Sequence, residues 1–307
     1  MELKPIVPIE IKKNMLVNDL VLAMKNIGVM GAGRIGEAAD IFTKMIQDKE
    51  CTVFLGAAGA LIPGGQRELL ISILEKKWID VFVCTGATLT HDLIEALGHN
   101  HYQGHHLIDD NELNKKGIDR IYDSFMKNDV YADLEKFFNE NDFTGEYNIK
   151  EFLWKIGYFT KKRSILKICY EKKIPIFCPG ISDSGIGLMV WNQLNKNKKI
   201  KVDVFNDLKE ILDIAWTCKK AGVFYLGGGL PKNFIQQAMQ FSPKDGASYG
   251  IQITTDRPES GGSSGAELRE GISWGKLNEK ARFIDVICDV TIALPLIINA
   301  VIDRIEP

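Results

Sequence analysis

The feature that most constrains this fold is a repeated alternation of short apolar runs with segments of helical periodicity. The runs are rich in β-branched and aromatic residues and are too short to be buried helices, which favours strands. Strands that alternate with amphipathic helices pair mainly in parallel, and the helices then cover both faces of the sheet. The sequence therefore predicts an α/β fold with strands at residues 52–55, 81–84, 175–177, 223–226, 251–254 and 283–288 and helices at 65–77, 89–97, 163–172, 208–221 and 231–239.

The domain organisation follows from length and from one region of different composition. The 307 residues fit one large α/β domain or two smaller ones. Residues 109–160 are charged and aromatic and show no strand pattern. We expect a single domain over residues 1–307, in which residues 109–160 form a helical insertion packed on the core.

Composition narrows the classes of partner. A net charge of −2 excludes a broad basic surface, so nucleic acid is not an expected partner. The six cysteines show no close pairing, which is typical of a reducing compartment, and a cytoplasmic location is expected. Residues 1–17 lack the apolar core of a signal peptide, and no apolar stretch reaches the length of a bilayer span, so a membrane is not an expected partner either.

The ends of the predicted strands carry glycine, proline or small polar residues. In parallel α/β sheets ligands bind at the carboxyl ends of the strands, where small residues let the main chain approach phosphate and ribose groups. These ends therefore predict an extended nucleotide site, although ordinary turns use the same residue types. The segments are 56–60, 85–87, 179–185, 227–229 and 254–256.

A lysine near the end of the chain is the strongest candidate for covalent chemistry. Lys276 follows Trp274 and Gly275 and comes soon after the glycine- and serine-rich run 260–265. A lysine held in a partly desolvated pocket loses its preference for the ammonium form, and the neutral amine can form an imine with a carbonyl or iminium carbon. The alternative is a surface lysine on a loop.

Two further patterns are given less weight. Residues 31–36 match the G-x-G-x-x-G dinucleotide pattern, and Asp48 follows at a suitable distance, but residues 27–30 make a poor preceding strand. A helix start that exposes Arg34 and Glu37 is the alternative.

All five histidines fall between His91 and His106, without the carboxylate or cysteine partners that a zinc site needs, so no metal site is assigned. His91 follows the strand end at 85–87 and is suited to act as a proton shuttle. The full set is His91, His99, His101, His105 and His106.

Taken together, the motifs of this chain resemble those of the deoxyhypusine synthase family. The matching motifs extend over residues 54–295 and so cover most of the sequence. The combination is highly specific, and Ser273-Trp274-Gly275-Lys276 in this context is close to diagnostic. The others are Phe54-Leu55-Gly56, Ile62, Arg67-Glu68, Thr85, Asp92-Leu93-Ile94, Pro179, Asp183, Gly227-Gly228-Gly229, Thr255, Ser264-Gly265-Ala266, Glu270, Asp289 and Pro295.

The resemblance implies a Rossmann-like, doubly wound sheet and a homotetramer with active sites between paired subunits. It also implies NAD-dependent aminobutyl transfer from spermidine, through an imine on an active-site lysine, to an acceptor amine. A plausible interface element for such a tetramer is the apolar C-terminal segment 291–305.

The resemblance also implies roles for single residues. Lys276 matches the covalent lysine, Glu270 a carboxylate that contacts the substrate amine, and Trp274 an aromatic wall along the polyamine. Thr85, Asp183, Gly228, Thr255 and Asp289 match positions that hold NAD, and Gly59 and Gly86 are assigned with them. His91 is assigned as catalytic, and Asn233 and Ser263 are assigned to substrate binding beside Trp274.

The sequence departs from the protein-modifying members at the positions that would receive a polyamine. Leu188 and Ser263 stand where two acids are expected, Thr90 and His91 replace a pair of glutamates, and Asn233 replaces a histidine. Several ammonium groups need anionic partners, because a buried unpaired charge is costly. The pocket has thus lost negative charge while the reacting residues are kept.

Four functions remain as hypotheses. The first is an NAD-dependent transferase that acts on small amines, as in homospermidine formation. The second is a deoxyhypusine synthase that modifies a lysine of a translation factor. The third is a non-catalytic NAD-binding paralogue, since a fold can persist after its substrate is lost. A metal-dependent hydrolase built on the histidines is the fourth.

Overall fold

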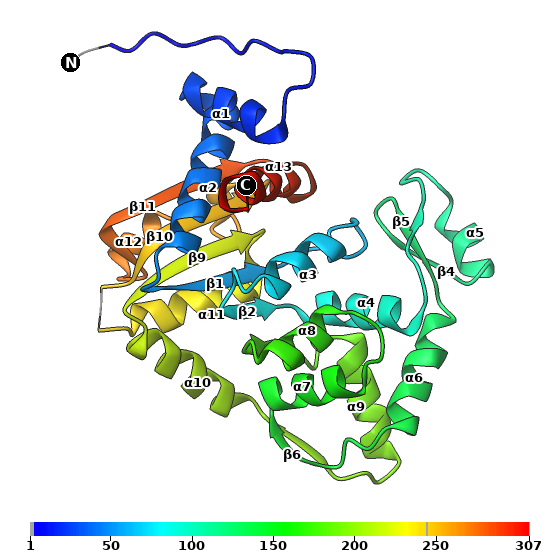
Figure 1. Cartoon of the computed structure of the whole chain (residues 1–307). Helices are drawn as coiled ribbons and strands as arrows, with labels where there is room; N and C mark the ends of the chain where they lie inside the picture. The colour runs from blue at the N-terminus through cyan, green and yellow to red at the C-terminus, as the bar shows by residue number, and fades with distance from the viewer. Residues whose placement is uncertain (1–2, 244, 307) are drawn as a thin grey trace. The chain divides into compact units, whose positions relative to one another are not determined.

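The central sheet contains all six expected strands and is parallel wherever its register is known. The computed structural model describes residues 3–243 and 245–306 (Figure 1). The strand order is β11-β10-β9-β1-β2-β7, so the chain reverses direction along the sheet after β7, as in a doubly wound fold. The bounds are β1 Cys51–Ala57, β2 Val81–Cys84, β7 Ile176–Phe177, β9 Lys220–Leu226, β10 Ala247–Thr254 and β11 Leu277–Ile287.

The chain divides into two compact units, Met1–Gly56 with Ile211–Pro307 and Ala57–Glu210. The first unit contains α1 Val17–Ile27, α2 Met30–Gln47, α11 Gly229–Gln240, the 3₁₀ turn η1 Pro258–Ser260, α12 Glu270–Ser273 and α13 Val290–Ile305, together with the second half of α10 Val204–Thr217. The second contains α3 Arg67–Glu75, α4 Gly86–Leu97, α8 Ile165–Lys172 and α9 Gly185–Asn195. The expectation of one domain stays a prediction. No helix in the described part of the chain is long and apolar enough to cross a membrane.

The apolar runs became strands because they are buried over nearly their whole length. All four residues of β2 are buried, as are six of the seven residues of β9. Within the first unit, the rings of Phe42 on α2 and Phe224 on β9 meet edge to face with their centroids 5.0 Å apart. The sheet is therefore the core that fixes the position of each strand end.

The segment 109–160 contains the expected helices, and it also contains strands that its composition did not indicate. The helices are α5 Asp110–Lys115, α6 Val130–Glu140 and α7 Ile149–Phe159. The strands β3 Tyr102–Gln103, β4 Ile118–Ile121 and β5 Ser124–Lys127 form a small antiparallel sheet, and β6 Gly145–Asn148 pairs in parallel with β8 Ile200–Asp203. A tight turn in which Tyr122 has a φ of 57° joins β4 to β5, and such short polar strands carry little apolar signal.

The G-x-G-x-x-G pattern lies inside helix α2, so it is not a loop between a strand and a helix. A Cβ on Gly36 would lie 2.6 Å from the Cα of Lys25, and one on Gly33 would lie 2.8 Å from the carbonyl carbon of Gly28. These two glycines therefore let α1 and the turn after it pack closely on α2. Close packing of the helices explains these glycines, so the structure gives no support to a nucleotide site at residues 31–36.

We predict that Gly36→Val lowers the free energy of unfolding by about 1–3 kcal/mol, because the new side chain overpacks the contact between α1 and α2. Chemical denaturation measures the effect. Gly31→Ala is the matched control, because a Cβ there meets nothing within 4 Å. If the pattern were instead a phosphate loop, Gly31→Ala would weaken NAD binding and Gly36→Val would leave stability unchanged.

Candidate functional site

Lys276 lies at a sharp turn between α12 and β11. Trp274 ends α12, and Gly275 has a φ of 69°, a left-handed conformation that favours glycine. The amide of Lys276 donates to the carbonyl of Gly271 over 2.8 Å, which closes the turn. The expected loop lysine is thus held by main-chain geometry at the first position before a strand.

The side chain of Lys276 is half-buried and stacks on its neighbour Trp274. Its ammonium lies 4.8 Å from the centre of the indole, a cation–π distance, and Trp274 is 56% exposed. Among residues 3–243 and 245–306, no carboxylate forms an ion pair with Lys276. The indole of Trp274 therefore orients the amine, and no carboxylate in these ranges competes for it.

The glycine-rich loop packs directly on the glycine triplet that follows β9. A Cβ on Gly228 would overlap the main chain of Ser264, so only glycine allows this approach. The amide of Gly229 donates to the hydroxyl of Ser264 over 3.0 Å, and the hydroxyl of Ser263 donates to the carbonyl of Gly229 over 3.4 Å. The structure therefore brings together two predicted positions, Gly228 and Ser263.

A buried lysine that sequence reasoning missed holds this loop in place. Lys232, on the first turns of α11, is 1% exposed, and its ammonium donates to the carbonyls of Ser263 and Ala266 over 2.7 and 2.6 Å. Burial lowers the pKa of Lys232 to about 8, and the positive charge of Lys276 acts in the same direction. The carboxylates of Asp285 and Glu270 oppose that decrease.

Asp285 is the second residue that the sequence reasoning missed. It lies on β11, and both of its carboxylate oxygens accept from the amide of Leu268, over 3.1 and 3.2 Å. Burial raises the pKa of Asp285 to about 6. The sequence signal that could have identified Asp285 is a charged residue within the apolar run 283–288. The corresponding signal for Lys232 is its position within the apolar start of α11.

Thr255 and Asp289 follow two paired strands and lie at the same edge of the sheet. Thr254 is paired with Ile287 in the register of β10 and β11, and the amide of Cys288 donates to the carbonyl of Thr254. Asp289 caps α13, where its Oδ1 accepts from the amide of Thr291 over 2.7 Å. Both residues are exposed, so both are accessible to a ligand.

Glu270 and Asn233 complete the predicted residues of the first unit. Glu270 is exposed at the start of α12 and lines an open cavity of about 780 Å³ with Glu267, Arg269 and Ser273 among others. Asn233 is half-buried on α11, next to Lys232. Glu270 is thus placed to receive a cationic ligand from solvent.

In the second unit, three of the predicted residues lie at the starts of α4 and α9. Thr85 caps α4, and its hydroxyl accepts from the amide of Thr88 over 3.3 Å. A Cβ on Gly86 would lie 2.7 Å from the hydroxyl of Ser184, so the start of α4 packs closely on the residue after Asp183. Asp183 itself is exposed. Thr85, Gly86 and Asp183 are therefore brought together.

Gly59 and Thr90 have different surroundings. Gly59 has a φ of 83° in an exposed turn where a Cβ would meet nothing within 4 Å, so its conformation alone explains the residue. Thr90 is 4% exposed; its hydroxyl donates to the carbonyl of Gly86 and accepts from the amide of Ile186. Thr90 therefore joins α4 to α9 and does not face a ligand.

His91 lies one residue beyond Thr90 and is part of a hydrogen-bonded chain. Its Nδ1 lies 2.9 Å from the Nε2 of His101, and the Nδ1 of His101 lies 2.7 Å from a carboxylate oxygen of Glu95. Burial lowers the pKa of His91 to about 4, and His101 contributes to the decrease. His91 is therefore neutral near pH 7.

The remaining histidines do not join this chain. His99 pairs with Asp133 at 2.9 Å, and the rings of His105 and His106 stack with centroids 5.0 Å apart. In the described part of the chain, no group of three or more His, Cys, Asp or Glu side chains could hold a metal ion.

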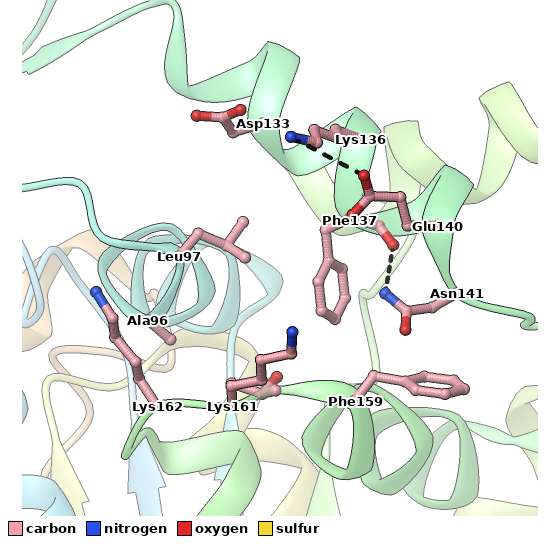
Figure 2. Close-up of a pocket in the computed structure, with 11 residues that line it drawn as sticks. Ala96, Leu97, Asp133, Lys136, Phe137, Glu140, Asn141, Phe159, Lys161 and Lys162 are labelled. Carbon is pink, nitrogen blue, oxygen red and sulfur yellow. Dashed lines mark hydrogen bonds and ion pairs between the residues drawn. The ribbon is translucent and has the colours of Figure 1, made fainter.

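A separate cavity of about 580 Å³ lies within the second unit, away from all predicted site residues. Figure 2 shows the ring of Phe137 on α6 and the ammonium of Lys161 pointing into it from facing elements. Its rim carries the ion pair of Lys136 and Glu140, at 3.9 Å. Exposed lysines on an aromatic floor are an ordinary surface feature, and we assign this cavity no function.

Comparison with known proteins decides the family. The family model for deoxyhypusine synthase matches residues 19–301, which is nearly the whole chain. The chain belongs to the deoxyhypusine synthase family. The match confirms the resemblance found in the motifs. Members of this family are transferases.

Relatives and solved structures agree with the family model. The chain is 41% identical to "Probable deoxyhypusine synthase 1" of Methanosarcina mazei, over 98% of this chain and 96% of that protein. It is 39% identical to the protein of the same name from Archaeoglobus fulgidus, over 96% and 97%. A crystal structure described as a deoxyhypusine synthase of Entamoeba histolytica has a TM-score of 0.61 at 18% identity, covering 91% of both chains. That structure shows that the fold is shared.

We predict that Lys232→Met lowers the free energy of unfolding by about 1–3 kcal/mol, because the carbonyl of Ser263 loses the ammonium that binds it and the carbonyl of Ala266 keeps the side-chain amide of Gln252 but loses the ammonium. The effect grows with pH. Because the pKa of Lys232 is lower in the folded protein than in the unfolded chain, the unfolded chain binds more protons between about pH 8 and 10, and the stability of the parent protein rises over that range.

Urea denaturation at several pH values measures this difference. Lys219→Met is the control, because Lys219 is an exposed lysine of the same unit whose side chain pairs with Glu50 at 3.3 Å. A loss of stability that is the same at pH 7 and at pH 10 would contradict the assignment of a perturbed, buried Lys232.

Proposed function

We propose that this protein is an NAD-dependent transferase that moves an aminobutyl group from a polyamine donor to an acceptor amine, most simply a small amine as in homospermidine formation. The observation that carries the proposal is the state of Lys276. Its amine is half-buried, stacked on Trp274 and free of an ion pair in the described part of the chain. Those are the properties expected of a lysine that forms an imine.

NAD would supply oxidation of the donor carbon–nitrogen bond by taking a hydride, and would return it at the end; each unit, considered by itself, has residues suited to contact it. In the first unit, Gly228 packs against the main chain of Ser264, which keeps the glycine-rich loop close to the end of β9. The exposed carboxylates of Asp183 and Asp289 are suited to accept from ribose hydroxyls, and Thr255 supplies a further hydroxyl. We propose that Gly228, Thr255 and Asp289 of the first unit contact the cofactor. For the second unit, considered by itself, we propose the same role for Thr85, Gly86 and Asp183.

In this mechanism the amine of Lys276 attacks the imine carbon of the oxidised donor, and the bond from that carbon to the donor nitrogen breaks. The four-carbon fragment is then an imine on Lys276, and the shortened amine leaves. Attack by the acceptor amine breaks the bond to Lys276 and regenerates the free lysine. Glu270 binds the terminal ammonium of the fragment, and Trp274 shields the imine from water.

The loss of negative charge at the predicted substrate positions bears on the donor amine. Leu188 is 56% exposed and Asn233 and Ser263 are uncharged, where acids or a histidine would bind a more highly charged ligand. Fewer carboxylates favour an amine with fewer ammonium groups. We also propose the homotetramer implied by the family, for which the exposed Ile292 on α13 is a candidate interface residue.

A second candidate is a deoxyhypusine synthase that modifies a protein lysine. The names of the relatives at 39–41% identity favour it. The two functions differ in the acceptor alone, so the protein with NAD and spermidine can be offered putrescine and the archaeal translation factor in competition. Product on putrescine supports the first function, and a mass increase of the factor supports the second.

We predict that Lys276→Ala abolishes product formation while leaving NAD affinity unchanged, because the amine is the point of covalent attachment and is not required to hold the cofactor. Mass spectrometry after borohydride reduction detects the four-carbon adduct on Lys276 in the parent protein and its absence in the variant. Lys280→Ala is the control, since Lys280 is an exposed lysine of β11, the strand that follows Lys276. Unchanged turnover in Lys276→Ala would overturn the covalent mechanism, and NAD binding without any adduct in the parent protein would favour the non-catalytic paralogue.

A further inference from the structure

A short turn of the first unit directs three charged side chains into one cavity. The turn is closed by the amide of Glu270, which donates to the carbonyl of Glu267 over 3.1 Å. The cavity of about 780 Å³ at this turn is lined by Pro258, Glu267, Arg269, Glu270, Ile272 and Ser273. All of these residues belong to the first unit, so the cavity lies within that unit.

The residue between Glu267 and Arg269 anchors the turn. Leu268 is 1% exposed, and its amide donates to the carboxylate of Asp285 over 3.1 and 3.2 Å. Its two neighbours along the chain are directed to the surface, where their side chains meet. The Nε of Arg269 lies 2.6 Å from the Oε2 of Glu267. A buried base therefore holds this ion pair on the wall of the cavity.

The two carboxylates of the cavity differ in their partners. Glu267 is paired with Arg269, whereas Glu270 forms no ion pair with any residue in the described part of the chain. Two carboxylates and one guanidinium give the lining a formal charge of −1. The side chains of Pro258 and Ile272 add an apolar surface against which methylene groups can pack.

Both carboxylates also act on buried charges of the unit. Burial raises the pKa of Asp285 to about 6, and the negative charge of Glu267 adds to that rise. Burial lowers the pKa of Lys232 to about 8, and the negative charge of Glu270 opposes that decrease. A charge that acts on residues inside the unit also acts on a cation in the cavity that it lines. The pairing of Glu267 therefore bears on the potential that an amine meets there.

We propose that the pair of Arg269 and Glu267 determines which donor amine the cavity accepts. Arg269 neutralises Glu267, so Glu270 alone receives an ammonium group, and an amine with more ammonium groups gains little from its additional charge. The inference rests on the proposed function, in which Glu270 binds the terminal ammonium of the donor fragment. Charged pairs at the rim of a site act mainly on selectivity. Arg269 is thus a specificity-determining residue that acts through Glu267.

Three variants change the charge of the lining and test this role. Arg269→Gln leaves a formal charge of −2, Glu267→Gln leaves 0, and the double variant restores −1. Calorimetric titration gives the dissociation constants of putrescine and spermidine, which carry about two and three ammonium groups near pH 7. The titrations are done without NAD, so that no transfer occurs.

A second ion pair of the same unit provides the matched control. The guanidinium of Arg257 pairs with Glu259 at 3.2 Å, with the same spacing along the chain and the same exposure of the arginine. Neither Arg257 nor Glu259 is among the described residues that line the cavity. We expect Arg257→Gln to leave the preference between the two amines unchanged.

We expect Arg269→Gln to raise the preference for spermidine over putrescine by about two- to fivefold, and Glu267→Gln to lower it by a similar factor, because the pair is partly exposed to solvent. The double variant returns to the preference of the parent protein, since the charge of the lining is the same. The changes shrink between about 0.01 M and about 1 M salt, because the Debye length falls from about 30 Å to about 3 Å.

Two results would overturn the inference. One is a preference that is the same in the parent protein and in both single variants. The other is a double variant that differs from the parent protein as much as Arg269→Gln does, because the effect would then come from a lost side chain and not from charge.

The outcomes also separate this inference from the proposed function. An unchanged preference in a protein that forms the Lys276 adduct refutes the role of the pair and leaves the transferase function in place. A preference that follows the charge, without any adduct on Lys276, supports the pair as a determinant of amine binding and refutes the transfer. If the parent protein binds neither amine, both are wrong.

Discussion

The ammonium of Lys232, sealed from water inside the first unit, connects the parts on which the proposed chemistry depends. It is bonded to two carbonyls of the glycine-rich loop, and that loop packs on the glycine triplet after β9. Removing a charge from water is costly, so this cation is retained only because the two carbonyls and the nearby carboxylates of Asp285 and Glu270 replace its hydration. The position of the loop, its contact with Gly228 and the electrostatic surroundings of Lys276 therefore depend on this one buried cation.

The second unit also has a buried charged side chain that is paired with an opposite charge. Its buried carboxylate, Asp92, pairs with the half-buried Arg67, which joins α3 to α4 and contacts Glu95. In each unit a buried charged side chain holds a neighbouring group in place: Lys232 holds the glycine-rich loop, and Asp92, through Arg67, holds Glu95. Such networks cost desolvation energy, so their presence close to the predicted ligand positions favours a functional over a purely structural purpose.

The sequence predicted the sheet well because β2 and β9 are almost entirely buried. A strand that is buried on both faces appears in the sequence as a continuous apolar run. The motifs named Lys276, Trp274 and Gly228 as site residues, and their roles stay predictions. The polar strands β4, β5 and β6 left no such pattern, because their residues are largely half-buried. Lys232, Asp285 and the partnership of His91 with His101 were missed because they depend on which side chains meet across the fold, and spacing along a chain does not encode that.

The positions of Gly33 and Gly36 show a limit of searching sequences for dinucleotide sites by the glycine pattern alone. In this chain a perfect glycine fingerprint arises from two helices pressed together at Lys25 and Gly28. A pattern scan would assign a dinucleotide site to residues that lie inside a helix. The G-x-G-x-x-G pattern can thus reflect a steric requirement for close packing of two helices. It indicates a dinucleotide site only where a strand precedes it.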